Sequence, residues 1–229
     1  MRKTIEELAY YSSELQQTLT RPRVTEYLHS GGHAEDFATT LSSSEQVSLA
    51  HVRNILVDPK FNQIIDGGML TFAMVRSRLE LGKKKGTDQE IADEIFESIQ
   101  TKGRMRIVLN LAWPLSTDEF TEFYSHVRSP LINNPQNTPD GSLSNQWDVF
   151  LTLGTTGASS FLLLQELQRK DNQPTWQLWR NFLGDRIIAQ AKPGTLRNEF
   201  GSEYNNVAHG SDSLESVRKD IRWMVRQIT

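Results

Sequence analysis

Residues 192–221 read KPGTLRNEFGSEYNNVAHGSDSLESVRKDI, and the second half of this stretch predicts the beginning of a helix. Asp212 and Glu215 are three residues apart, as in a capping pair that satisfies free N–H groups at a helix start. The apolar stripe that follows consists of Leu214, Val217, Ile221 and either Met224 or Val225. His209 stands just before this helix, after an expected strand. A histidine there can accept a phosphoryl group, because the helix dipole favours the added negative charge.

Strands alternate with helices from Met69 up to this stretch. Strands are expected at MLTFAMV from Met69, at RMRIVLNLAW over 104–113 and at SSFLLLQEL over 159–167. Helices are expected over 88–100, after the capping box of Ser116 and Glu119, and from Trp176 to Gly184. This order predicts an α+β fold, in which a ferredoxin-like antiparallel sheet carries helices on one face.

Residues 1–66 have a different pattern and are expected to form a helical extension of unknown role. A helical repeat begins with Ile5, Leu8 and Ala9 and is ended by Ser30-Gly31-Gly32, and a second helix is expected after Ser42. Gly67-Gly68 separates the extension from a domain over 69–229. Inside this domain, residues 129–145 are rich in Pro, Asn, Gly and Ser, which predicts an exposed loop.

The composition is that of an ordinary soluble protein. The 229 residues are 37% hydrophobic and 23% charged, with a formal net charge of -3. No apolar run approaches the roughly 18 residues of a membrane-spanning helix, and the first residues are too polar for a signal peptide, so a cytoplasmic location is expected. The absence of cysteine excludes disulfides and thiolate metal sites. The charge balance argues against nucleic-acid binding through a broad basic surface.

Two linked motifs resemble the signature of the nucleoside diphosphate kinase family. Residues 206–213 read NVAHGSDS, which is similar to N-x-x-H-G-S-D-S, and residues 193–197 read PGTLR, which is similar to P-G-T-[IL]-R. The resemblance implies that a nucleoside triphosphate with Mg²⁺ phosphorylates His209 and that a nucleoside diphosphate then removes the phosphoryl group. It also implies a homo-oligomer, with Mg²⁺ held mainly by the nucleotide phosphates. No metal site made by the protein is expected.

Four arginines are expected to bind phosphate. Arg197 and Arg180 resemble arginines that grip the phosphates in the family, a task that suits the planar guanidinium fork. At two other positions the sequence departs from the family. Arg76-Ser77-Arg78 stands where the family has K-P-D, and Arg186 stands in place of a threonine near the phosphates. Both changes keep the attraction for phosphate and alter its geometry. For Arg180, an exposed helix charge is the alternative.

The resemblance implies roles for four further residues. Tyr124 is similar to a tyrosine whose hydroxyl reaches the phosphate and the active histidine, although it could instead belong to the core. Asp220 falls where the family has a glutamate that orients the histidine, and is one methylene shorter. Asn206 is similar to an asparagine that hydrogen-bonds the ribose. Trp147 lies close to a phenylalanine that stacks on the nucleobase, and could equally be an ordinary buried tryptophan.

A rival interpretation belongs to a different class of protein. The chain could be a nucleotide-binding or scaffold module that kept the fold and the histidine, lost efficient turnover and uses residues 1–66 for contacts with a protein partner. The lost K-P-D and the loop over 129–145, which would be an insertion relative to the family, favour this reading. The combination of His209, Asn206, Arg197 and Asp212 favours catalysis, because a scaffold has no need to keep it.

Overall fold

The computed structural model describes residues 10, 11, 15, 19–138, 142–167 and 173–228, so the expected helical repeat around Ile5, Leu8 and Ala9 lies outside it. In this part of the chain, the main sheet is antiparallel and has the strand order β2-β5-β1-β6. Its strands are β1 (Leu70–Val75), β2 (Met105–Pro114), β5 (Ala158–Glu166) and β6 (Ala208–Gly210). This is the order of a ferredoxin-like sheet, so the predicted fold class is confirmed.

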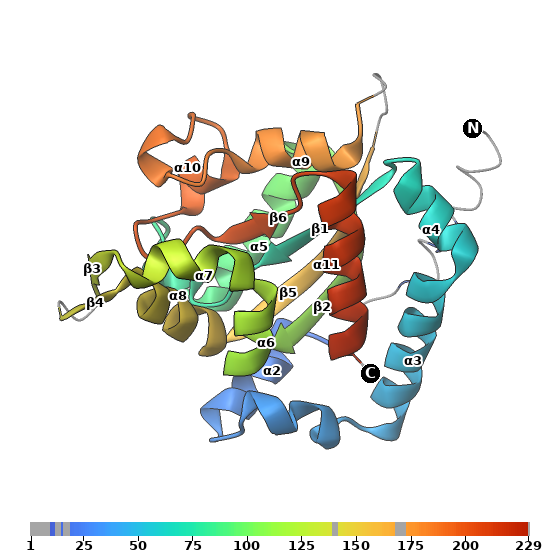
Figure 1. The fold of residues 1–229 in the computed structure, drawn as a ribbon. Helices are drawn as coiled ribbons and strands as arrows, with labels where there is room; N and C mark the ends of the chain where they lie inside the picture. Colours follow the sequence, from blue (N-terminus) through green and yellow to red (C-terminus); the bar gives the residue numbers. More distant parts are fainter. Residues whose placement is uncertain (1–9, 12–14, 16–18, 139–141, 168–172, 229) are drawn as a thin grey trace.

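Helices cover both faces of the sheet (Figure 1). One face carries α2 (Arg21–His29), α3 (Ser43–Val57), α4 (Pro59–Asp66), α6 (Thr117–Phe123), α8 (Gln146–Thr155) and α11 (Leu214–Gln227). The other carries α5 (Asp88–Thr101), α9 (Thr175–Leu183) and α10 (Leu196–Phe200). The expectation of helices on one face is wrong, because β1 is apolar on both: Phe72 and Met74 face one core, while Ala73 and Val75 face the other.

The expected strand at RMRIVLNLAW is formed by β2, but its side chains do not alternate regularly between the two faces. Its register against β5 shifts between Ile107 and Leu109, which is the mark of a β-bulge. Met105 and Ile107 therefore contact the core beneath α5 and α9, whereas Leu109 and Leu111 contact the opposite core. Because the bulge adds one residue to β2, each later side chain of the strand points to the face opposite the one that a regular strand would give it.

The N-terminal segment shares a core with the sheet. The helix α3 begins with a capping box between Ser42 and Glu45, and a 3₁₀ helix over Ala34–Thr40 precedes it. Phe61 and Ile64 of α4 are fully buried in the same apolar cluster as the α11 stripe and the β1 side chains that face it. The division of the chain into an extension and a domain stays a prediction.

The expectation of a loop over 129–145 is wrong. The helix α7 (Ser125–Ile132) enters this range, and β3 (Pro135–Asn137) pairs with β4 (Leu143–Asn145) as a hairpin. Backbone pairing thus satisfies the polar groups that the Pro, Asn and Gly content suggested would face water. Within the described residues, no helix is both long enough and apolar enough to cross a membrane.

Candidate active site

The strand β6 places His209 opposite Met74 of β1. Just before it, Val207 adopts φ 52, a left-handed conformation that is rare for a β-branched residue. Two hydrogen bonds hold Val207: its N–H donates to Oδ1 of Asn205 (2.8 Å), and its carbonyl accepts from the N–H of Arg76 (2.9 Å). Backbone strain of this kind persists only where the surroundings enforce it, and it gathers at functional sites.

Gly210, directly after the histidine, packs against the indole of α9. A Cβ at this position would come 2.1 Å from Nε1 of Trp179, closer than any real contact. We therefore expect Gly210→Ala to destabilise the fold by about 1–3 kcal/mol, as overpacking usually does. Urea unfolding would measure the change. Gly67→Ala is the matched control, because the nearest atom to its added Cβ would lie 3.4 Å away and the backbone is already helical. Equal stability of the two variants would contradict the expectation.

A single hydrogen bond fixes the ring of His209. Its Nε2 lies 3.0 Å from Oδ2 of Asp220, a residue of α11 that is 5% exposed. The same carboxylate oxygen accepts a bond from Oγ of Ser211 at 2.7 Å. A carboxylate only accepts, so Nε2 carries the ring hydrogen and Nδ1 keeps a free lone pair. The site thus holds the histidine in the tautomer that a nucleophile needs.

The electrostatic surroundings keep His209 neutral. Burial lowers its pKa, and the hydrogen bond and negative charge of Asp220 raise it; the positive charges of Arg76 and Arg197 lower it again, and the net shift is downward. The side chain is still 19% exposed. The ring is therefore an uncharged nucleophile at neutral pH that a solute can reach.

Aromatic rings surround the histidine on the side of α6. The ring centroids of Phe72, Phe123 and Tyr124 lie 6.2, 4.9 and 5.8 Å from that of His209. The hydroxyl of Tyr124 is buried and has no hydrogen-bond partner in the described part of the chain. Burial raises the pKa of Tyr124, so the hydroxyl stays protonated. An unpaired buried hydroxyl is costly, which favours a ligand that accepts its hydrogen.

Two buried arginines stand beside these rings. Arg76 follows β1 directly, and its guanidinium carbon lies 5.1 Å from the ring centroid of Tyr124 and 4.4 Å from that of Phe150. Arg197 of α10 donates to the carbonyls of Gly184 (3.0 Å) and Ala208 (3.1 Å). The Nε atoms of both arginines are buried and have no partner in the described part of the chain.

The site has an excess of positive charge. Burial, followed by the charges of Arg76 and Arg180, lowers the pKa of Arg197 to about 9. Among the described residues, none of these three arginines forms an ion pair with a carboxylate. The charge of Asp185 opposes this shift only in part, since the net shift of the Arg197 pKa is downward. Guanidinium groups that repel one another and form no ion pair make a site for an anion, and phosphate matches their fork.

Known proteins with related sequences share this region. The family model described as nucleoside diphosphate kinase matches residues 151–228. The nucleoside diphosphate kinase of Geobacter sulfurreducens is 29% identical over 160 residues, which are 69% of this chain and 96% of that protein. Nucleoside diphosphate kinase 6 of Xenopus tropicalis is 43% identical over 49 residues, which are 20% of this chain and 27% of that protein. The sequence of this chain is therefore related to those of nucleoside diphosphate kinases. A crystal structure of the nucleoside diphosphate kinase from Encephalitozoon cuniculi has the same fold, with a TM-score of 0.50, 16% identity and coverage of 68% of this chain and 87% of that one.

The nucleoside diphosphate kinase match contains only part of the candidate site. It includes His209, Asp220, Arg180, Arg186, Arg197 and Asn206. It does not include Arg76, Tyr124 or Trp147, which the fold brings to the same region from β1, the end of α6 and α8.

Two of the expected site residues, Trp147 and Arg186, have surroundings that differ from those of the residues around His209. Trp147 is 3% exposed and packs against Phe120 and Phe150, so its ring offers no open face to a base and the alternative of an ordinary buried tryptophan is favoured. Arg186 is exposed, and its side chain makes no hydrogen bond or ion pair in the described part of the chain. Arg180 and Asn206 are half-buried, and Arg180 is electrostatically coupled to Arg197.

The helix that follows His209 is capped one residue later than expected. Ser213 is the N-cap of α11, and its Oγ accepts from the N–H of Ser216 at 3.1 Å. The expected pair of Asp212 and Glu215 is therefore wrong. Asp212 instead accepts from the hydroxyl of Ser216, and this bond lowers the pKa of Asp212.

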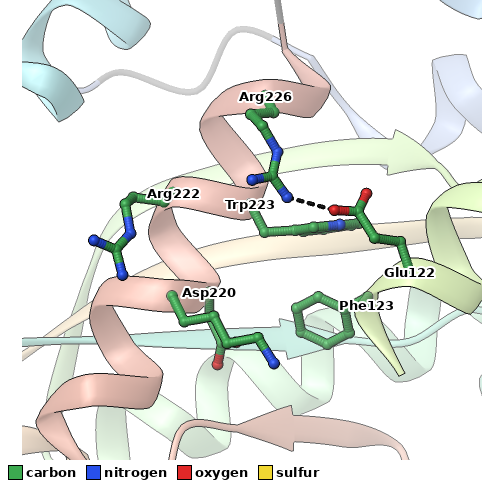
Figure 2. A pocket seen from close by; sticks show the side chains of 7 residues that line it. Glu122, Phe123, Asp220, Arg222, Trp223 and Arg226 are labelled. Carbon is green, nitrogen blue, oxygen red and sulfur yellow. Dashed lines mark hydrogen bonds and ion pairs between the residues drawn. The ribbon is translucent and has the colours of Figure 1, made fainter. Parts of the chain in front are cut away.

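A hollow lies behind Asp220 (Figure 2). It has a volume of about 220 Å³ and is lined by Glu122, Phe123, Lys219, Asp220, Arg222, Trp223 and Arg226. An ion pair between Arg226 and Glu122 (2.5 Å) joins α11 to α6 at its edge. The helix α11 carries Asp220, and α6 ends just before Tyr124. The packing of these two helices therefore sets the distance between Asp220 and Tyr124, which lie on either side of His209.

Sequence reasoning missed three residues of the site. Asn205 holds Val207 and the turn after β1, Phe150 supports the guanidinium of Arg76, and Arg21 reaches the same turn from α2. Asn205 precedes Asn206, the first residue of the recognised motif, but no motif or periodicity in the sequence marks Asn205 itself. Phe150 stands one helical turn after Trp147, which was the only available hint. Arg21 gave no signal, because its partners are distant in the sequence.

Proposed function

We propose that the chain transfers the terminal phosphoryl group of a nucleoside triphosphate to a nucleoside diphosphate through a phosphohistidine on His209. The observation that carries the proposal is the bond from Nε2 to Asp220, which leaves Nδ1 free beside unpaired guanidinium groups. The similarity to nucleoside diphosphate kinases supports the same activity.

The reaction balances on the ring of His209. The lone pair of Nδ1 attacks the terminal phosphorus, a P–N bond forms, and the P–O bond to the leaving diphosphate breaks with its electrons going to that oxygen. The ring then carries a positive charge, with hydrogen still on Nε2, and the carboxylate of Asp220 offsets it at 3.0 Å. In the second half, an oxygen of a nucleoside diphosphate attacks the same phosphorus and the P–N bond breaks.

The other groups stabilise charge during the transfer. Arg76, Arg180 and Arg197 would offset the negative phosphates, and the free hydroxyl of Tyr124 would donate to the phosphoryl group in flight. Asn206 is proposed to bind the ribose hydroxyl, since its side chain makes no hydrogen bond in the described part of the chain. Arg186 is exposed and is proposed to bind the phosphates of an incoming nucleotide.

Mg²⁺ belongs to the substrate in this proposal. No group of three or more His, Asp or Glu residues that could hold a metal occurs in the described part of the chain, whereas three arginines favour an anion. The residues present therefore suit a nucleotide whose own phosphate oxygens bind the cation, which neutralises part of their charge.

Labelled nucleotide tests the proposal directly. Purified protein is incubated with γ-labelled ATP and Mg²⁺, and acid-labile label on the protein is measured before and after addition of GDP. We expect label that forms on His209 and moves to GDP. Label that forms and never moves, or tight nucleotide binding without any label, would instead support the rival function.

The rival, a nucleotide-binding module with weak turnover, is favoured by the covered face of Trp147. The β3–β4 hairpin also contacts the loop before His209, because Nε2 of Gln136 donates to the carbonyl of Glu203 at 3.1 Å.

Homo-oligomer formation and a cytoplasmic location stay predictions. Light scattering of the purified protein would measure the first.

The labelling rate should depend on pH in a way that the burial of His209 predicts. Because burial lowers the pKa of His209, the ring stays neutral as the pH falls through its ordinary value of about 6.5, and we expect the rate to drop only at lower pH. Initial rates of label formation between about pH 5 and pH 8 would measure this. Asp220→Asn should move the drop further down, because Asp220 raises the pKa of His209. A drop centred at or above 6.5 in the unaltered protein would contradict the expectation.

A further inference from the structure

Arg21 is buried at the end of β1, although it begins α2 in the N-terminal segment. It is 3% exposed. Its Nη2 donates to the carbonyl of Val75 (3.3 Å) and to Oγ of Ser160 (3.1 Å). Both Nη atoms donate to the carbonyl of Arg76, at 3.3 and 3.4 Å. One guanidinium thus binds the last carbonyl of β1 and the carbonyl of Arg76, the next residue, in the segment that leads to the proposed phosphate site.

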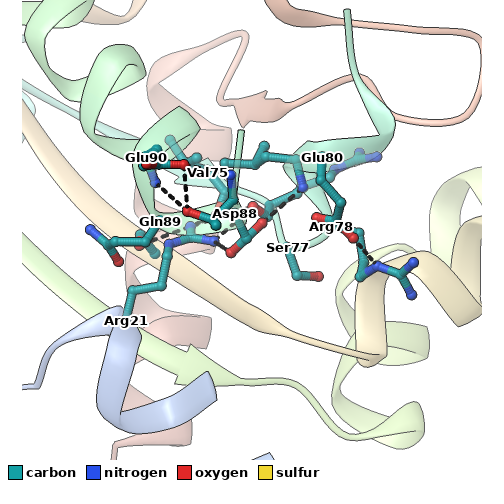
Figure 3. A network of polar contacts seen from close by, with 12 residues as sticks. Arg21, Val75, Ser77, Arg78, Glu80, Asp88, Gln89 and Glu90 are labelled. Carbon is teal, nitrogen blue, oxygen red and sulfur yellow. Dashed lines mark hydrogen bonds and ion pairs between the residues drawn. The ribbon is translucent and has the colours of Figure 1, made fainter. Parts of the chain in front are cut away.

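Asp88 neutralises Arg21 and ties it to the same turn. Its Oδ2 lies 2.6 Å from Nη1 of Arg21, and its Oδ1 accepts from the N–H of Leu79 at 2.8 Å. Asp88 is the first residue of α5, so the network joins α2, β1 and α5 (Figure 3). A buried cation is stable only when it is paired and hydrogen-bonded in this way.

The turn that carries Arg76 is held along its whole length. Asn205 donates from Nδ2 to the carbonyls of Ser77 and Arg78, both at 2.9 Å. Arg78 has φ 57, so the backbone is strained at this point and needs such support. With Arg21, these bonds satisfy the carbonyls of four consecutive residues, 75 to 78.

The backbone of Arg76 is therefore fixed on both sides. Its N–H donates to Val207, next to the histidine strand, and its carbonyl accepts from Arg21. Its guanidinium lies over the rings of Tyr124 and Phe150, and its Nε atom has no hydrogen-bond partner in the described part of the chain. The position of its guanidinium thus depends on where the backbone is held. A displacement of about 1 Å in a group that contacts the reacting phosphate can cost about 10²-fold in rate.

We propose that Arg21 is a positioning residue for the phosphate site: by holding the backbone of Arg76, it makes the N-terminal segment part of the machinery for phosphoryl transfer. The inference rests on the proposed function above. It assigns to residues 1–66 a role inside the molecule, where the sequence had suggested only contacts with a protein partner.

Arg21→Lys tests the inference in the full chain. The ammonium of the lysine keeps the positive charge. It cannot donate hydrogen bonds to two carbonyls, a hydroxyl and a carboxylate at once, as the planar guanidinium of arginine does. We expect single-turnover labelling of His209 to slow about 10-fold or more, with a smaller change in nucleotide affinity. Arg23→Lys is the matched control on the same helix, because Arg23 is 41% exposed and pairs with Glu45 at 2.8 Å. Its labelling rate should equal that of the unaltered protein.

A measurement of stability distinguishes the positioning role of Arg21 from a purely structural role. Ile64→Val removes a methylene from the core in α4, away from the Arg21 network, and should lower the melting temperature without slowing the labelling. If Arg21→Lys does not fold, Asp88→Asn takes its place, because it weakens the anchor of Arg21 and keeps an acceptor for Leu79. An equal slowing by Ile64→Val would overturn the inference.

A second measurement does not need phosphoryl transfer. The charge of Arg76 lowers the pKa of His209, so any variant that moves Arg76 away should raise it. An NMR titration of His209 should therefore show a higher pKa in Arg21→Lys and in Arg76→Gln, and no change in Arg23→Lys. If the unaltered protein is never labelled, the proposed function fails and this titration still decides the role of Arg21. A pKa and a labelling rate in Arg21→Lys equal to those of the unaltered protein, beside an Arg76→Gln variant that changes them, would overturn the inference.

Discussion

The variant His209→Ala should form no acid-labile phosphoprotein, with a loss of transfer from ATP to GDP greater than about 10³-fold. The expectation follows from the geometry of the site, in which Asp220 occupies Nε2 and leaves Nδ1 as the free nucleophile. No other side chain takes over, because the hydroxyl of Tyr124 is held in its protonated form by burial. Label after incubation with γ-labelled ATP, and the transfer of that label to GDP, are the two quantities to measure.

The matched control is His126→Ala. His126 is exposed on α7, two residues after Tyr124, and should be dispensable for labelling. Circular dichroism of both variants would establish that they are folded. A His209→Ala protein that still takes up acid-labile label would end the proposed mechanism, and loss of label in His126→Ala alone would move the phosphorylation site to that residue.

The variant Arg76→Gln should lower the rate of labelling by about 10²-fold while leaving the protein as stable as before or more so. The Nε atom of Arg76 has no hydrogen-bond partner and the guanidinium forms no ion pair in the described part of the chain, so its removal breaks no ion pair. It lies near Arg197, whose pKa is lowered to about 9 by burial and then by the charges of Arg76 and Arg180. Relief of this repulsion favours the charged form of Arg197 in the folded protein and offsets the lost contacts with the two rings.

Rate and stability should therefore move in opposite directions in Arg76→Gln, which is unusual for a buried residue. Single-turnover labelling and the melting temperature would be measured on the same preparation. Arg53→Gln, in which an exposed arginine of α3 is changed, is the control for the loss of one positive charge. A large fall in melting temperature would mean that Arg76 supports the fold, and an unchanged labelling rate would remove it from the proposed site.

The local signals in the sequence were sufficient for most elements of the fold. The capping box at Ser116 and the strand at MLTFAMV each depend on neighbours within a few residues, and both are confirmed. The motif around His209 likewise led to the histidine, and the structure brings Asp220, Tyr124 and Arg197 around it. Their catalytic roles stay predictions.

The features that were missed depend on distant partners. The bulge in β2 arises from its register against β5, and the hairpin over 135–145 arises from pairing between residues that each resemble loop. The contacts of Arg21 with Arg76 and Ser160 span 55 and 139 residues. No periodicity in a single segment carries information about such contacts, because a buried arginine and an exposed one look alike in a sequence.

The packing of α3 and α4 against α11 has a consequence for how this protein is made. The helices α3 and α4 leave the ribosome before α11 does. Phe61 and Ile64 share their cluster with Val217 and Ile221, so the nascent chain cannot complete this core until α11 has been synthesised. The apolar side chains of α3 and α4 therefore stay without their final partners until then, and transiently exposed apolar surface promotes aggregation.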